Sequence, residues 1–164
     1  MMTTFTLTAT ERRANALNAA SHGGAYNTKA LVATVEVAAA TTVGRTILFG
    51  HIPSNARPLL ISKLYSDDLA TSGSPTLDIG LAAVKGNLAN ADDPDALTNA
   101  IAISSAVTGA NLIADIANAG LPAWDYVASE TSDPGGELAV YGSLVDAPVN
   151  AAGTITIEML YTVD

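Results

Sequence analysis

The sequence contains no cysteine, and only 5% of its 164 residues are aromatic. The absence of cysteine excludes disulfide frameworks, thiolate zinc sites and cysteine nucleophiles. A chain of this length fits one domain, which buries roughly 70% of the surface that the unfolded chain exposes. Because 49% of the residues are hydrophobic while few are aromatic, the core must be assembled mostly from small and β-branched side chains.

Long uncharged apolar runs are also absent. The strongest hydrophobic stretch, residues 31–50, is interrupted by Glu36 and Arg45, whereas a membrane span needs ~18 to 20 uncharged apolar residues. The N-terminus lacks the basic segment and apolar core of a secretory signal. We therefore expect no membrane association and a soluble protein made in the cytoplasm.

Lysine and arginine are missing from residue 86 onward. Residues 1–85 hold all seven basic residues and five acids, a balance of 7 − 5 = +2, and the remainder holds 16 − 5 = 11 acids. Nucleic-acid binding rests chiefly on Lys and Arg, so we expect no nucleic-acid partner. The asymmetry indicates that the N-terminal half faces a partner while the acidic half faces solvent.

Motifs for catalysis and cofactor binding are missing as well. No G-x-S-x-G elbow, zinc-binding helix, phosphate loop or dinucleotide fingerprint occurs. The densest acid cluster, Asp92, Asp93 and Asp95, does not fit a calcium loop, because Pro94 and Ala96 occupy ligand positions. Helix capping is the simpler interpretation of this cluster. The sequence therefore predicts no enzyme and no cofactor.

Four carboxylates accompany two strand patterns at the end of the chain. They are Asp133, Glu137, Asp146 and Glu158. The two patterns, over residues 137–146 and 154–163, alternate apolar and polar residues as half-buried antiparallel strands do. We interpret the carboxylates as markers of the turns and polar faces of a β-hairpin rather than as an active site.

Residue patterns predict a mainly β fold. Strands are predicted over residues 29–39, 45–53, 56–68, 74–84, 137–146 and 154–163. Capping and proline signals predict short helices over 90–101 and 121–128, with Trp124 closing one end of the core. Residues 1–28 are interpreted as an N-terminal arm, extended or a short helix, before a β-sandwich domain over 29–164. Without helical crossovers for parallel strands, we expect an antiparallel β-sandwich, jelly-roll-like, with a few short helices.

Three stretches follow the order of patterns in a known family. They are "FGHIPSNARPLLISKLYSDDL", then "TLDIGLAAVKG" with "DDPDALTNAIAISSA", and finally residues 121–163 with their D-P-G-G turn. Together, over residues 47–163, they resemble small virion structural proteins of tailed bacteriophages, of the capsid-associated or decoration (cement) type. Where that family often has a basic residue before its short helix, this chain has Leu121 and Pro122.

The resemblance implies a role and a location. It implies a non-enzymatic protein, made in the cytoplasm of a bacterial host, that binds the major capsid protein on the outer capsid surface and stabilises the shell. Another virion component, such as a head-tail connector, tail or fibre module, is the first alternative. A host- or glycan-binding module is the second.

Two sets of residues are candidate contacts. Arg12, Arg13 and Lys29 belong to the arm region or its boundary, and we expect them to lie on acidic capsid surface. Leu60 and Leu64 belong to a strand pattern that is apolar on both faces, which is typical of a strand at a subunit contact. We therefore expect a homo-oligomer, with a trimer on a local threefold axis of the shell.

Overall fold

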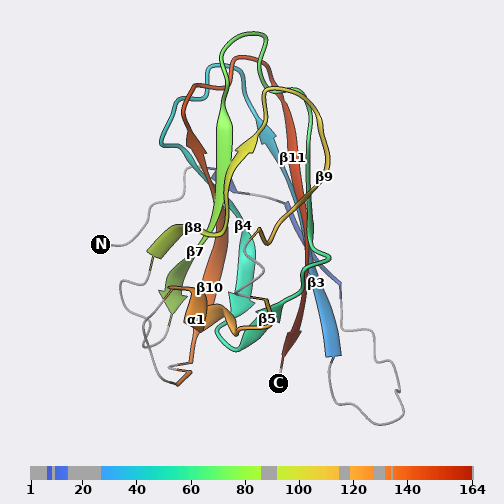
Figure 1. Cartoon of the computed structure of the whole chain (residues 1–164), viewed down its shortest axis with the longest axis vertical. Coiled ribbons are helices and arrows are strands. Elements are labelled where there is room, and N and C mark those ends of the chain that lie inside the picture. The colour runs from blue at the N-terminus through green and yellow to red at the C-terminus, as the bar shows by residue number, and fades with distance from the viewer. Residues whose placement is uncertain are drawn as a thin grey trace.

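The computed structural model contains two facing β-sheets and a short helix (Figure 1). It describes residues 7–8, 10–14, 27–85, 92–114, 119–127, 132–133 and 135–163. Sheet A contains, in spatial order, β1 (Leu7–Thr8), β4 (Thr46–Pro53), β10 (Glu137–Val145), β7 (Thr76–Lys85) and β8 (Asp92–Ala102). Sheet B contains β2 (Thr10–Ala14), β3 (Asn27–Val37), β11 (Gly153–Val163), β6 (Lys63–Ser66) and β9 (Val107–Asn111), and β5 (Ala56–Pro58) also pairs with β11. The helix α1 spans Ala123–Val127, and no helix in these ranges is long or apolar enough to cross a membrane.

The main strands pair in a nested order, first with last. β3 pairs with β11, β4 with β10, β6 with β9, and β7 with β8, all antiparallel. This is the order that results when one long double strand is rolled into two packed sheets, which is the jelly-roll topology. The antiparallel β-sandwich predicted from the sequence is therefore confirmed, and it is of the jelly-roll type.

The closing hairpin predicted over residues 137–146 and 154–163 is wrong. Both segments are strands, but β10 pairs with β4 and β7 in sheet A, whereas β11 pairs with β3 and β6 in sheet B. The connection between them crosses from one sheet to the other and is held by Asn150. The Asn150 side chain accepts a hydrogen bond from the Thr71 amide (2.6 Å) and donates one to the Ser72 carbonyl (2.7 Å). Alternation predicts strands but does not identify their partners.

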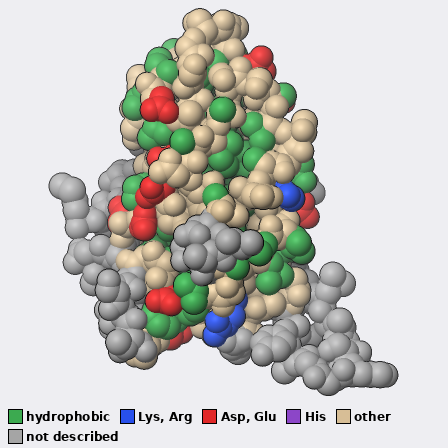
Figure 2. All heavy atoms as spheres, in the orientation of Figure 1, with side chains coloured by type: hydrophobic (Ala, Val, Ile, Leu, Met, Phe, Trp, Pro, Cys, Tyr) green, Lys and Arg blue, Asp and Glu red, His purple; other side chains and the backbone are tan. Residues whose placement is uncertain are grey.

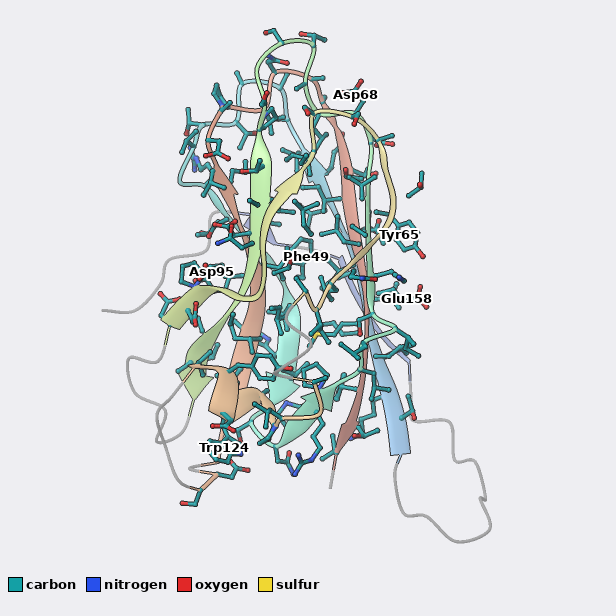
Figure 3. All side chains as sticks on the ribbon, viewed as in Figure 1. Phe49, Tyr65, Asp68, Asp95, Trp124 and Glu158 are labelled. Atoms are coloured by element: carbon teal, nitrogen blue, oxygen red, sulfur yellow. The ribbon has the colours of Figure 1, made fainter. Side chains whose placement is uncertain are left out.

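The hydrophobic core fills the space between the two sheets. Fully buried side chains include Ile47, Phe49, Leu77, Ile79, Leu138 and Val140 from sheet A, and Leu31, Ile155, Ile157 and Met159 from sheet B. Figure 3 shows Phe49 between the sheets and Trp124 near one end of the sandwich. Trp124 packs against the core from α1 while remaining partly exposed, which confirms both the predicted helix and the position of its tryptophan.

The helix predicted over residues 90–101 is wrong, because Asp92–Ala102 form strand β8. Pro94 is compatible with this strand, since β8 is the edge strand of sheet A and a missing amide donor there breaks no ladder. The acids that suggested helix capping lie at the beginning of the strand. Pairing with β7 therefore outweighs the local preference.

β8 is strongly bulged where it meets β7. Ile79 is opposite Thr98, but Leu81, only two residues further, is opposite Asp93. At this bulge the backbone of Asp93 and Pro94 lies close to Gly80. A Cβ atom added to Gly80 would be 2.1 Å from the Asp93 carbonyl oxygen. Glycine at this position therefore permits a close backbone approach that no other residue allows.

The single strand predicted over residues 56–68 is also wrong. β5 and β6 are separate strands, and both pair with β11. Ser62 lies in the gap, where its hydroxyl donates to the Leu59 carbonyl (2.6 Å) and accepts from the Leu160 amide (3.0 Å). The segment has apolar residues on both faces because it combines an exposed corner with a strand that faces the core.

The described part of the N-terminal arm is extended. β1 pairs in parallel with β4, and β2 pairs antiparallel with β3, so residues 10–14 are not helical. Residues 1–6, 9 and 15–26 lie outside the described part of the chain. The strands attach the arm to both sheets, and the domain boundary at residue 28 stays a prediction.

Candidate interaction surfaces

A group of carboxylates lies at the beginning of β8. The Tyr141 hydroxyl of β10 donates a hydrogen bond to Asp92 (2.5 Å). The Asp95 amide donates to the Asp93 carboxyl group (3.3 Å), and the Asn99 side-chain amide donates to the Asp95 carboxylate (2.8 Å). The first contact ties the edge strand to β10 in the middle of sheet A, and the other two lie within β8.

The pKa values of the Asp93 and Asp95 carboxyl groups move in opposite directions. Partial burial raises the pKa of Asp93, and the hydrogen bond with Asp95 adds to the effect. Hydrogen bonds from Asp93 and Asn99 lower the pKa of Asp95. The Asp93 carboxyl group therefore holds the proton when the pair carries one.

The chemistry available to this group is limited. An open hollow of about 290 Å³ lies beside it and is lined by Asp93, Asp95, Ala96, Leu97, Thr98, Asn99, Ala114 and Tyr126. The described residues contain no set of three His, Asp or Glu side chains that could hold a metal ion. Burial, followed by the hydrogen bond to Asp92, raises the pKa of Tyr141, so the phenol stays protonated and acts as a hydrogen-bond donor. We interpret the group as a structural tie of β8.

The four carboxylates of the closing segment lie apart. Asp133 lies in a turn, Glu137 lies at the beginning of β10, Asp146 lies just after the end of β10, and Glu158 lies on β11. Asp133 accepts a hydrogen bond from the Gly135 amide (2.8 Å), and Asp146 accepts one from the Thr76 hydroxyl (2.6 Å). Their predicted role as turn and polar-face residues holds, although the strands they flank do not form a hairpin.

The predicted capsid contacts lie on neighbouring strands of sheet B. Arg12 and Arg13 belong to β2, with Arg13 opposite Leu31 of β3. Lys29 precedes Leu31 by two residues, lies opposite Tyr161 and is half-buried. The register thus brings these three backbone positions together at one edge of the sheet. Their contact with a capsid stays a prediction.

The two predicted subunit contacts separate in the structure. Leu64 is fully buried between the sheets of its own chain, so it is unavailable to a second subunit, contrary to the sequence-based expectation. Leu60 lies at the corner between β5 and β6 and is 41% exposed. A subunit contact through Leu60 stays a prediction.

The outer faces of the two sheets differ in how far they are covered. On sheet A, Ala82, Ala139 and Tyr141 alternate with core residues along their strands, yet they are buried, so the chain itself covers this face. On sheet B, Tyr65 and Glu158 point away from the sandwich and are exposed (Figure 3). In the view of Figure 2, acidic side chains collect on the left, over β7 and β8, whereas the right side mixes basic, acidic and hydrophobic groups. The outer face of sheet B is therefore the sheet face open to a partner.

Sequence reasoning missed two of the exposed apolar residues of this region. Ile61 is 63% exposed at the corner, and Tyr65 is 39% exposed on β6, but neither is among the contacts predicted for the strand over residues 56–68. Pro58 and Ser62 are the signals that could have revealed the corner. They lie within a stretch of five residues, and each interrupts the apolar alternation of the predicted strand.

Comparisons with known proteins give matches at the level of structure. No protein-family model matches the sequence, and no curated protein matches it. The chain is similar to a chain of the cyanophage Pam1 capsid asymmetric unit, with a TM-score of 0.57 and 20% identity over 92% of this chain and 94% of that one. It is also similar to a chain of the Ralstonia phage GP4 capsid, with a TM-score of 0.52 and 21% identity over 82% of this chain and 84% of that one. At these identities the likeness shows that chains of two phage capsid structures share this fold.

Proposed function

We propose that the protein is a non-enzymatic structural component of a bacteriophage virion that binds the outer capsid surface and stabilises the shell as a decoration protein. The observation that carries the proposal is the fold shared, over nearly the whole chain, with chains of two phage capsid structures. The separation of the closing carboxylates supports a role without catalysis. The partner in this proposal is the major capsid protein.

The mechanism is stabilisation by mass action. A protein that binds the assembled shell but not its separated subunits stabilises the shell at each site, by about 2.7 kcal/mol at a free concentration 100-fold above Kd. Many equivalent sites in a symmetric lattice multiply this effect. A modest affinity of the protein for each capsid site is therefore sufficient to stabilise the whole shell.

Shells with and without the protein test the proposal. Removing the gene from its phage should lower the temperature at which particles lose their genome, and adding the purified protein should restore it. In purified virions its copy number should be comparable to that of the major capsid protein. A connector, tail or fibre component would instead be present in few copies, and particles of unchanged heat resistance would contradict a stabilising role.

The basic arm residues provide a test of the binding mode. Deleting residues 1–28 would remove β1 and β2 together with the predicted contacts, so charge reversal is the sharper change. The double variant R12E/R13E should lose capsid binding if the arm lies on acidic shell surface. The control is R45E, which reverses one exposed charge in the loop between β3 and β4 and so makes half the change of net charge. Equal capsid binding by both variants would refute the arm contact.

A further inference from the structure

The outer face of sheet B carries a row of residues across neighbouring strands. Val32 of β3 lies opposite Glu158 of β11, which lies opposite Lys63 of β6. The next row contains Tyr65, opposite Thr156 of β11. Residues two apart on a strand share a face, so Lys63 and Tyr65 belong to one surface. We call it the β6–β11 face.

The two charges of this face are not paired with each other by a described contact. The Lys63 ammonium donates a hydrogen bond to the neutral side chain of Asn111 (2.7 Å). Glu158 is exposed, and the described residues provide no hydrogen bond or ion pair to its carboxylate. A positive and a negative group therefore stand side by side, each with charge left to interact with a partner.

Apolar side chains adjoin these charges. Tyr65 is 39% exposed on the face itself, and Leu60 and Ile61 are 41% and 63% exposed at the neighbouring corner. Half-buried Val32 of β3 and Leu160 of β11 belong to the same face as Glu158. An apolar surface with a few charged groups is the composition of a protein contact.

We propose that the β6–β11 face binds the same face of a second copy of this chain, around a two-fold axis. A chain of net charge −9 repels its own copies, so a contact between copies requires a region where charges balance. Lys63 and Glu158 supply that balance. A two-fold axis that lies in the plane of the contact and runs along the strands between β6 and β11 places each Lys63 opposite the Glu158 of the other copy, since the same patch is used twice in such a contact.

The proposed pair differs from the trimer expected from the sequence. That expectation rested on a strand covered on both faces, whereas Leu64 faces its own core and only the outer side of β6 is open. The proposal concerns the isolated protein and does not depend on capsid binding.

The size of the face sets the expected affinity. Four strands about 4.8 Å apart and the two outward-facing rows of Lys63 and Tyr65, about 6.8 Å apart, give a planar area of roughly 260 Å². This is below the about 800 Å² per partner of a typical stable complex, and the exposed corner adds to it. We expect a dissociation constant in the micromolar range, about 1–100 µM.

Sedimentation of the full chain over micromolar concentrations tests the proposal. The natural sequence should shift from the 16.6 kDa of one chain to twice that mass. E158K and K63E should each weaken the pairing by about tenfold or more, because like charges then face each other. The double variant K63E/E158K should restore it to within about threefold, since the charges are exchanged but remain complementary.

Control variants separate this contact from general effects of charge. D125K makes the same change of net charge as E158K at an exposed position of α1 and should dimerise as well as or better than the natural chain. Y65S should weaken pairing without any change of net charge. Thermal unfolding of each variant verifies that it is folded.

Three results would overturn the proposal. The first is a natural chain that stays monomeric throughout the concentration range. The second is an assembly of any size that E158K and K63E leave unchanged. The third is a double variant that pairs no better than the folded single variants, which would mean that Lys63 and Glu158 do not meet across the contact.

Discussion

Replacing Gly80 with alanine tests how β8 is held against β7. A Cβ at this position would lie 2.1 Å from the Asp93 carbonyl oxygen and 2.4 Å from the Pro94 carbonyl carbon. Both are backbone atoms, so no side-chain rotation relieves the overlap. Gly80 is not among the glycines with positive φ, so alanine adds no backbone strain. The cost of G80A is therefore steric.

The magnitude follows from the displacement that β8 must make. Ordinary van der Waals contact begins at 3.4 Å, so the Asp93 carbonyl must withdraw by 3.4 − 2.1 = 1.3 Å. Overpacking costs about 1–3 kcal/mol, and more where backbone moves, so we expect about 3–4 kcal/mol. At roughly 2–4 °C per kcal/mol for a domain of this size, Tm should fall by roughly 6–16 °C.

Thermal unfolding followed by circular dichroism measures this effect against a matched control. Gly142 lies on the adjacent strand β10, and its added Cβ would meet Leu77 Cδ1 at 3.0 Å and Phe49 Cε2 at 3.1 Å. These side-chain atoms can shift, so G142A should cost about 1 kcal/mol, or roughly 2–4 °C. A Tm for G80A equal to or above that of G142A would refute the described packing of β8.

Three further changes test separate parts of the molecule. Y141F removes the hydrogen bond to a β8 carboxylate and should cost about 1.5–3 kcal/mol, seen as an earlier urea midpoint; an unchanged midpoint would argue against the tie. L64A in the core should cost about 2–5 kcal/mol, whereas L60A at the exposed corner should stay within about 0.5 kcal/mol, and equal losses in urea unfolding would contradict their placement. Hydrogen bonds from the Thr154 amide and hydroxyl lower the pKa of Asp67 below 3.8, so its stabilising effect is present above the unfolded pKa and lost as pH falls through the folded one. D67N should therefore be less stable than the natural chain at neutral pH and equal to it in strong acid, as a pH series of unfolding curves would show.

The strands of this fold were largely predictable because their side chains alternate. β4 and β10 lie within predicted segments, and β3, β7 and β11 extend only one or two residues beyond theirs, because each has one face on the core and the pattern of burial appears directly in the sequence. The sandwich class followed from their number and spacing. Their pairing did not, because nested partners lie far apart along the chain and local patterns contain no information on distant contacts.

The errors fall where local chemistry favours another structure. Asp92 and Pro94 are good helix-starting residues. The segment is nevertheless a strand, because Gly80 on the neighbouring strand leaves room for the bulge with which β8 pairs with β7. Leu60 and Leu64 are equivalent in hydrophobicity, and only the corner formed around Ser62 separates an exposed residue from a core residue. Tertiary context decided both cases.

The candidate surfaces were less predictable than the fold. The sequence identified the basic residues and the acidic C-terminal half, but the opposition of Lys63 and Glu158 depends on the pairing of β6 with β11. These residues are far apart in the chain, and their juxtaposition appears only with the register. Leu60 was predicted as a contact because its strand pattern is apolar on both faces, whereas the structure places it at an exposed corner, and the contact itself stays a prediction.

The nested strand order has a consequence for the synthesis of the protein. β11, the last strand, lies in the interior of sheet B and bonds to β3, β5 and β6. Sheet B therefore cannot close until β11 leaves the ribosome, and the edge of β3 that pairs with β11 stays unpaired until then. Such long-range pairing folds slowly and exposes strand edges to other chains. Premature termination before β11 should therefore yield insoluble fragments rather than a smaller domain.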